Sequence, residues 1–351
     1  MNKYKLSVII PTFNTGDLLK DLFDSIKNQT IGFDNVEIIF VDDASSDAHT
    51  LDLINSYESD YSNCKAIFLN ENSSFPGKPR NIGLEASTSD FVIFADHDDS
   101  YNPDAFEKLY DNITDNNADV AISNFNQVFQ EKIIPFKSIF KDSKAIKIDS
   151  IDENKDILRI PAAIWTRLFR KECLIKNNIR FLEGMLAEDV YVATNVSLNA
   201  NGIIYLNDFY GYNYKIRDRK GNKSTIHIRN KKYIEAMLNG YYEISNMLKE
   251  QNKEKYGKII FKSHLTSWLY TIVLSRIDLK DKTELLIKSS NIFKKYYTED
   301  PYFQGKYVNL ANYIINEDFS RAILEANKLE EDINSKSYKK ILRKLKGKFL
   351  R

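Results

Sequence analysis

The stretch Phe91-Val92-Ile93-Phe94-Ala95-Asp96-His97-Asp98-Asp99 joins five apolar residues to a turn that holds three carboxylates within four positions. A short apolar run followed by a polar turn also occurs earlier in the chain, at residues 6–14 and 36–47. Between such runs, as at residues 17–28, apolar residues recur at the spacing of a helix. Strands that are apolar throughout and alternate with helices are typical of a mainly parallel sheet with helices on both faces. We therefore expect an α/β fold.

Composition narrows the class of protein. The chain has 351 residues, and its 50 Lys and Arg residues almost balance 49 Asp and Glu residues, for a net charge of +1. This balance argues against a general nucleic-acid binder, which would carry a dominant basic surface. The two cysteines, Cys64 and Cys173, are too few for a disulfide framework, so a reducing cytoplasm fits. The longest apolar stretch, residues 265–274, is about half the length of a membrane span, so we expect no segment that crosses a bilayer.

The second half of the chain follows a different pattern. Additional strands are expected at 128–134, 165–169, 203–206 and 210–216, with helices near 171–177 and 189–200. From about residue 229 to 334 only helical patterns remain. The sequence therefore predicts two domains, an α/β domain at 1–228 and an all-helical C-terminal region at 229–351.

Polar groups at predicted strand ends are the candidates for chemistry, because sheets of this kind bind ligands beyond the carboxyl ends of their strands. Asp42 and Asp43 follow the strand at 36–41, where a solvated turn is the ordinary interpretation. The three carboxylates at 96–99 would repel one another unless a cation shared them, and hard oxygen ligands suit Mg²⁺ or Mn²⁺ with a substrate diphosphate. An acidic turn before the next helix is the alternative, and His97 could bind the metal or point away.

Two further groups carry charge at predicted helix starts. The stretch 76–83 contains Lys78 and Arg80 but lacks the full phosphate-loop pattern. Its basic side chains could contact phosphate or simply form a charged helix cap. Glu188 and Asp189 open the helix at 189–200, where acidic residues ordinarily interact with the helix dipole.

Together the four groups resemble the family 2 glycosyltransferases, which are inverting enzymes of GT-A fold. The resemblance extends over residues 5–228 and rests on the motifs at 7–14, 41–47, 80–84, 94–99 and 187–189, with further similarity at 165–172 and 212–217. The short segment 76–81 also resembles bacterial enzymes that add N-acetylglucosamine to wall teichoic acid. The GT-A fold is a nucleotide-sugar-binding, Rossmann-like arrangement, which agrees with the expected α/β fold.

The resemblance implies a nucleotide-sugar site. Pro11 and Phe13 would line the nucleotide pocket, and Asp42 would accept a hydrogen bond from the uracil edge of a UDP-sugar donor. Lys78 and Arg80 would face the donor phosphates or sugar.

The resemblance also implies a metal site and a catalytic base. Asp96 would lie by the ribose and sugar, and Asp98, with Asp96, would hold the Mn²⁺ or Mg²⁺ that bridges the diphosphate. In the family the residue between these two acids is usually small, whereas here it is His97. Asp189 would be the general base that takes the proton of the acceptor hydroxyl, with Glu188 beside it.

The expected function is therefore inverting transfer of a hexosyl or N-acetylhexosaminyl group from a UDP-sugar. The acceptor would be a cell-envelope glycan, a polyol-phosphate polymer of teichoic-acid type or a glycoprotein glycan. A catalytically idle nucleotide-sugar-binding protein on the same scaffold is the alternative. A nucleotidyltransferase would need a Gly-rich basic loop after the first strand, and Pro11-Thr12-Phe13-Asn14 is not one.

The C-terminal region raises separate possibilities. Eight of the sixteen residues at 336–351 are Lys or Arg, and apolar residues recur among them at helical spacing. Such a helix suits an anionic membrane surface, which would place a cytoplasmic enzyme on the inner face of the cell membrane. A solvated helix, or one docked on a neighbouring subunit of a homo-oligomer, is the alternative. The helical region 229–351 could bind acceptor, self-associate or both.

Overall fold

The strands and helices are those of a computed structural model, which describes residues 3–130, 132–141, 145–217, 229–300 and 305–334. The strands are β1 (Leu6–Thr12), β2 (Val36–Asp42), β3 (Cys64–Phe68), β4 (Phe91–Phe94), β5 (Ser100–Tyr101), β6 (Val120–Phe129), β7 (Lys132–Pro135), β8 (Ala145–Ile148), β9 (Arg167–Arg170) and β10 (Ile203–Lys215). The helices among and between them are α1 (Leu18–Lys27), α2 (Ala48–Asp60), α3 (Gly77–Ala86), α4 (Ala105–Asp115), α5 (Lys171–Lys176) and α6 (Glu188–Asn199). All of these elements belong to the first of two compact units, Met1–Ile216 and Arg217–Arg351.

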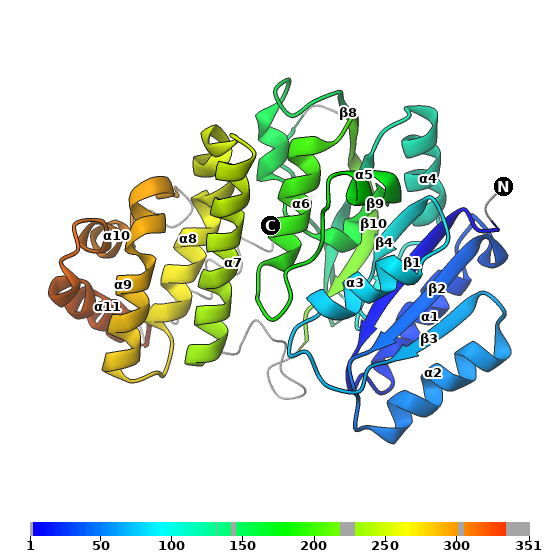
Figure 1. The fold of residues 1–351 in the computed structure, drawn as a ribbon, viewed down its shortest axis with the longest axis horizontal. Coiled ribbons are helices and arrows are strands. Elements are labelled where there is room, and N and C mark those ends of the chain that lie inside the picture. Colours follow the sequence, from blue (N-terminus) through cyan, green and yellow to red (C-terminus); the bar gives the residue numbers. More distant parts are fainter. Residues whose placement is uncertain (1–2, 131, 142–144, 218–228, 301–304, 335–351) are drawn as a thin grey trace. The chain divides into compact units, whose positions relative to one another are not determined.

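The strands form one sheet in the order β3-β2-β1-β4-β9-β6-β10-β5, with β7 paired to β6 and β8 to β10. Figure 1 shows β3, β2, β1 and β4 side by side. Strands β3, β2, β1 and β4 are parallel, as the sequence predicts for this half. The rest of the sheet is mixed, because β9 runs antiparallel to both β4 and β6. Since β9 reverses direction, its first residue lies at the same edge as the carboxyl end of β4.

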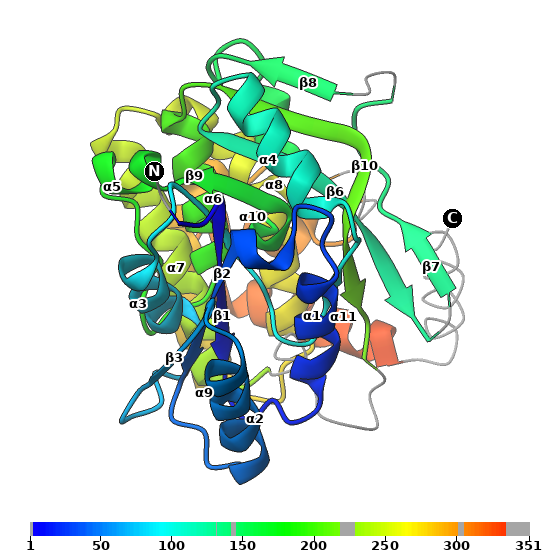
Figure 2. The ribbon, with the colours of Figure 1, turned by 90° about the vertical axis from the view of Figure 1, so that its right-hand side faces the viewer.

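Helices cover both faces of the parallel strands. Leu6, Val8 and Ile10 of β1 pack in one buried cluster with residues of α1, including Phe23. Ile9 points to the opposite face, where α3 approaches so closely that a Cβ on Gly83 would lie 2.3 Å from an Ile9 methyl carbon. Figure 2 shows α1 and α3 on opposite sides of β1. This arrangement leaves the loops at the carboxyl ends of the strands open for function.

Several predicted strand boundaries differ from the structure; the strand expected at 165–169, for example, begins at Arg167. The strand expected at 128–134 is an antiparallel pair, β6 and β7. The start of β6 was hidden by its buried polar residues Ser123, Asn124 and Asn126. The Asn126 side chain, for example, donates a hydrogen bond to the side chain of Asn213, far away in the chain. The strands expected at 203–206 and 210–216 are one strand, β10, with a register shift between Leu206 and Tyr210.

The second unit contains only helices among its described residues: α7 (Lys231–Glu250), α8 (Gly257–Val273), α9 (Leu279–Tyr296), α10 (Val308–Ile315) and α11 (Phe319–Asn334), with a short 3-10 turn before α8. Trp268, Phe261 and Phe293 are fully buried among them. Gly257 begins α8, where a Cβ would lie 2.1 Å from the Tyr296 ring. Within the described residues, no helix has both the length and the apolar character that a bilayer crossing requires.

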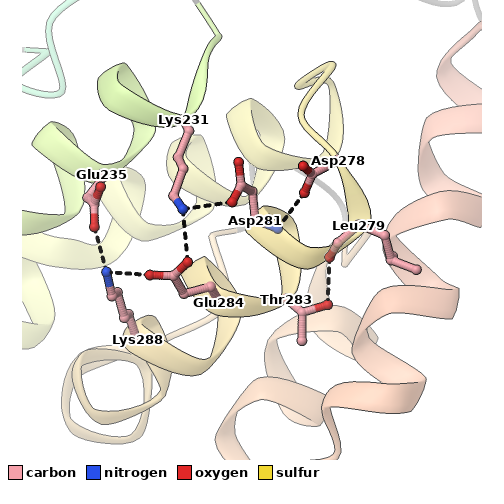
Figure 3. Close-up of polar contacts among 8 residues, drawn as sticks. All are labelled: Lys231, Glu235, Asp278, Leu279, Asp281, Thr283, Glu284 and Lys288. Carbon is pink, nitrogen blue, oxygen red and sulfur yellow. Dashed lines mark hydrogen bonds and ion pairs between the residues drawn. The ribbon is translucent and has the colours of Figure 1, made fainter.

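A chain of ion pairs joins α7 to α9 (Figure 3). The ammonium of Lys231 lies 2.7 Å from Asp281 and 2.9 Å from Glu284. The ammonium of Lys288 lies 2.8 Å from Glu284 and 2.6 Å from Glu235. Single exposed pairs contribute little to stability, but a network in which each lysine meets two carboxylates contributes more and links the two helices.

Two sequence predictions concern residues outside the described part of the chain. The basic segment 336–351 lies there, so its membrane role stays a prediction. The predicted domain boundary at 228/229 falls at the end of residues 218–228, which also lie there. The assignment of 1–228 as catalytic and 229–351 as a separate helical region stays a prediction as well.

Candidate active site

The carboxyl ends of β1 and β2 carry the residues predicted to hold a nucleotide. Pro11 lies in β1 opposite Val41 and is buried, and Phe13 follows the strand with 46% of its surface exposed. Asp42 ends β2, and its buried carboxylate accepts a hydrogen bond from the Thr12 hydroxyl at 3.1 Å. An exposed aromatic ring and a fixed carboxylate therefore lie at the same edge of the sheet.

Arg80 connects two of the predicted acidic groups. Its Nη2 lies 2.7 Å from Oδ1 of Asp96, which follows β4, and its Nη1 lies 2.8 Å from Oε1 of Glu188, the first residue of α6. The guanidinium is buried over the Phe181 ring, and its Nε has no hydrogen-bond partner among the described residues. Burial opposes the charge on Arg80, but Asp96 and Glu188 outweigh it and raise the pKa of Arg80.

The segment that leads into α6 is held against α3. A Cβ on Gly77 would lie 2.0 Å from the carbonyl oxygen of Leu182, so this close approach requires glycine. The Asn81 side chain donates to the Phe181 carbonyl at 2.9 Å and accepts from the Phe181 amide at 2.8 Å. Ala187, directly before α6, has a φ of 62°, a left-handed conformation that costs a residue with a Cβ about 1–2 kcal/mol. These contacts fix where α6 begins.

Glu188 and Asp189 occupy the first turn of α6. Burial, helped by the charge of Asp189 and opposed by Arg80, raises the pKa of Glu188 to about 7. Burial also raises the pKa of Asp189, although its carboxylate accepts a hydrogen bond from the Val190 amide at 2.7 Å. A carboxylate whose pKa is raised toward neutral pH is suited to accept a proton.

Asp99 has a different environment from the other acids of its turn. Its two oxygens accept hydrogen bonds from the Tyr212 hydroxyl at 2.9 Å and from the Lys215 amide at 2.6 Å. Burial and the charge of Asp98 raise the pKa of Asp99 to about 8. Asp99 therefore ties the turn to β10, which leaves Asp96 and Asp98 as the acids of this turn that can face a ligand.

Asp96 and Asp98 fit a divalent cation whose remaining ligands would be water and substrate phosphates. Both side chains are half-buried, as is His97 between them. The described residues hold no group of three or more His, Cys, Asp or Glu side chains arranged around a metal position. Mg²⁺ ordinarily binds one or two carboxylates and completes its shell with water and substrate phosphates, so two acids are a sufficient protein contribution.

The structure separates the two basic residues of the 76–83 segment and reveals a third. Lys78 is exposed on α3, whereas Arg80 is buried in the acidic cluster. Arg167, at the start of β9, is also buried; it donates to the Pro161 carbonyl at 2.9 Å and is attracted by Asp189. Burial lowers the pKa of Arg167 to about 10. Arg167 belongs to the segment 165–172 that contributed to the predicted resemblance, but no role was predicted for it.

Comparison with known proteins identifies the family. Residues 7–172 match the model of glycosyl transferase family 2. Residues 7–172 therefore carry a family 2 glycosyltransferase domain. The predicted resemblance and the expectation of a glycosyltransferase are therefore confirmed at the level of the family, and the range matched includes β1 to β9 and the acidic turn at 96–99.

Proteins similar to this chain match different parts of it. It is 29% identical over 337 residues to the poly(ribitol-phosphate) beta-N-acetylglucosaminyltransferase TarP of Staphylococcus aureus, covering 93% of this chain and 99% of TarP. It is 29% identical over 256 residues to a poly(ribitol-phosphate) beta-glucosyltransferase of Bacillus spizizenii, of which the match spans only 38%.

A solved structure confirms the fold. The crystal structure of S. aureus TarS 1–349 in complex with UDP-GlcNAc matches with a TM-score of 0.72 and 25% identity, covering 93% of this chain and 90% of that one. The expected GT-A-like sheet followed by a helical C-terminal region is therefore confirmed.

Proposed function

We propose that this protein transfers a sugar from a UDP-sugar to a hydroxyl of a polyol-phosphate polymer of teichoic-acid type, with inversion at the anomeric carbon. The observation that carries the proposal is the Arg80 bridge, which joins the acidic turn after β4 to the first turn of α6 through contacts of 2.7 and 2.8 Å. A donor site and a base must lie side by side in such an enzyme. The names of TarP and of the Bacillus relative support this acceptor class, and the ligand named for TarS supports UDP-GlcNAc as a donor.

The donor would lie at the carboxyl ends of β1, β2 and β4. The exposed ring of Phe13, next to buried Pro11, offers an apolar surface for the base, and Asp42 offers a carboxylate oxygen to its N–H edge. Asp96 lies where the ribose and sugar would follow. Lys78 is exposed at the start of α3, from where its flexible side chain could reach the phosphates.

A divalent cation held by Asp98 and Asp96 would offset the charge that develops on the leaving diphosphate. Arg80 stays charged, because Asp96 and Glu188 raise its pKa. Its ion pair with Asp96 keeps it close to the cation position. Its own carboxylate partners already engage it, so we assign to it the positioning of both acids beside the donor.

Asp189 would act as the general base. As the acceptor oxygen attacks the anomeric carbon, Asp189 takes its proton, and the bond from that carbon to the diphosphate oxygen breaks with both electrons leaving on UDP. One displacement on the face opposite the leaving group inverts the configuration. Glu188 is paired with Arg80, which leaves Asp189 as the acid of this turn free to meet an acceptor.

The names of the relatives support two sugars as the transferred group. The TarP and Bacillus relatives are named for N-acetylglucosaminyl and glucosyl transfer, so the donor is UDP-GlcNAc or UDP-glucose. We assign the helical region 229–351 to acceptor binding, self-association or membrane contact. We propose that the protein acts in the cytoplasm or on the inner face of the cell membrane, where a UDP-sugar donor would be available.

A transfer assay tests the proposal. The full chain is incubated with radiolabelled UDP-GlcNAc or UDP-glucose, poly(ribitol phosphate) and Mn²⁺, and label on the polymer and UDP release are measured. We expect polymer-bound label from one donor, with the opposite anomeric configuration by NMR. Tight UDP-sugar binding with neither transfer nor hydrolysis would indicate an idle binding protein instead.

A further inference from the structure

Asn14 links the two loops that would hold the nucleotide. It follows Phe13 in the loop after β1, is half-buried and has a φ of 49°. Its Oδ1 accepts hydrogen bonds from the amides of Ser46 and Asp47, both at 2.9 Å. These amides belong to the loop after β2, so one side-chain oxygen bridges the two loops.

A second path runs from the Asn14 backbone to Asp42. The Asn14 amide donates to the Ser45 hydroxyl at 2.8 Å, and that hydroxyl donates to Oδ1 of Asp42 at 2.6 Å. The Ser45 amide donates to Oδ2 of Asp42 at 2.7 Å. The orientation of the Asp42 carboxylate therefore depends on where Asn14 holds the loop at residues 45–47.

Asparagine combines two properties that this position requires. A φ near +50° disfavours most side chains but is tolerated by asparagine, aspartate and glycine. Of these three residues, asparagine and aspartate also supply a side-chain oxygen that can accept from two amides, whereas glycine supplies none. The sequence alone shows Asn14 only as the end of the first motif.

We infer that Asn14 is a positioning residue for the uridine part of the donor, acting by holding Asp42 and Phe13 in fixed relation to each other. This inference rests on the proposed function and deepens it. The contacts of Asn14 described above all lie in the loops after β1 and β2, whereas Arg80 and Asp189 are placed by α3 and α6. Asn14 should therefore set donor affinity and leave the chemical step nearly unchanged.

Variants at two asparagines with nearly the same positive φ distinguish the effect of losing the Asn14 side chain from the effect of introducing glycine into the backbone. Asn14→Gly removes the amide oxygen and keeps the positive φ, and Asn14→Asp restores an acceptor. Asn178, exposed after α5 with a φ of 50°, gives the matched control Asn178→Gly. Ser45→Ala breaks the second path with a small change that leaves the backbone intact. UDP affinity is measured by calorimetry with Mn²⁺, KM and kcat by UDP release, and folding by thermal unfolding.

We expect Asn14→Gly to weaken UDP binding and raise the KM for the donor by about tenfold, the effect of losing one or two hydrogen bonds, with little change in kcat. Ser45→Ala should act in the same direction, Asn14→Asp should recover most of the affinity, and Asn178→Gly should bind UDP as the wild type does. Wild-type affinity in folded Asn14→Gly, or no recovery in Asn14→Asp, would overturn the inference while leaving the proposed function standing. Failure of the wild-type protein to bind UDP would overturn both.

Discussion

The hydroxyl of Tyr212 donates a hydrogen bond of 2.9 Å to the buried carboxylate of Asp99, 113 residues away in the chain. The contact ties β10 to the acidic turn after β4. The indole ring of Trp165 stacks on the ring of Tyr212, with the two ring centroids 4.2 Å apart. The turn that would carry the metal ligands is therefore anchored from one side by Asp99 and from the other by the Arg80–Asp96 ion pair.

Asp99 should make stability depend on pH. Its pKa is raised from an ordinary 3.8 to about 8, so between these pH values the folded protein keeps a proton that the unfolded chain releases. The free energy of unfolding should therefore fall as pH rises through this range, and Asp99→Asn should remove that contribution. Urea unfolding of both proteins from pH 5 to pH 9 measures it. The stability of Asp99→Asn relative to wild type should increase up to about pH 8 and then level off. Asp208→Asn, at an exposed residue, is the control and should show no such change. A stability difference between Asp99→Asn and wild type that does not depend on pH would contradict the raised pKa of Asp99.

Arg80→Gln should destabilise the fold strongly. The change leaves Glu188 buried without its partner, and breaking a buried ion pair from one side costs about 3–5 kcal/mol. The loss should be smaller at pH 5 than at pH 8, because Glu188, whose pKa is already raised to about 7, can then take up a proton. Arg180→Gln, which breaks the exposed pair with Glu85, should cost less than about 1 kcal/mol. Equal losses in the two variants would show that the Arg80 bridge is not buried in solution.

Gly77→Ala should displace the segment before α6. Its Cβ would lie 2.0 Å from the Leu182 carbonyl, and backbone must move to relieve such a contact. We expect a loss of about 1–3 kcal/mol in the free energy of unfolding and lower turnover. Gly184→Ala is the control within the same segment, since its φ of 70° is strained but its Cβ would meet nothing within 4 Å. Turnover in Gly77→Ala as high as in Gly184→Ala would contradict a role for this contact.

Asp98→Ala should abolish the metal dependence of UDP binding while the protein stays folded. Calorimetric titration of UDP with and without Mn²⁺ measures this dependence, and a Tm within a few degrees of wild type checks the fold. Asp104→Asn, at a half-buried residue before α4 that pairs with Lys108, should keep the wild-type metal response. If UDP binding to Asp98→Ala still responds to Mn²⁺ as in wild type, Asp98 is not a ligand.

Most local elements of the first unit, such as β1, β2, β4 and α1, were predictable because each is an apolar run or an amphipathic stretch bounded by polar turns. The short strands β5 and β8 were not predicted. The start of β6 was not predicted either, since Asn124 and Asn126 are polar residues made compatible with the core by distant partners. The same reason limits site prediction. Arg80 was predicted as a donor contact, but its pairing with Glu188 spans 108 positions, and only the packing of α3 against the segment before α6 brings the two together.

The role of Asp189 is tested by Asp189→Asn, which keeps the size of the side chain and removes its ability to take a proton. Single-turnover transfer to poly(ribitol phosphate) and calorimetric UDP affinity are measured on the same preparations, with exposed Asp52→Asn as the matched control. We predict UDP affinity near wild type and a transfer rate lower by about 10²-fold or more. A rate close to wild type at saturating acceptor would contradict the assignment of Asp189 as the general base.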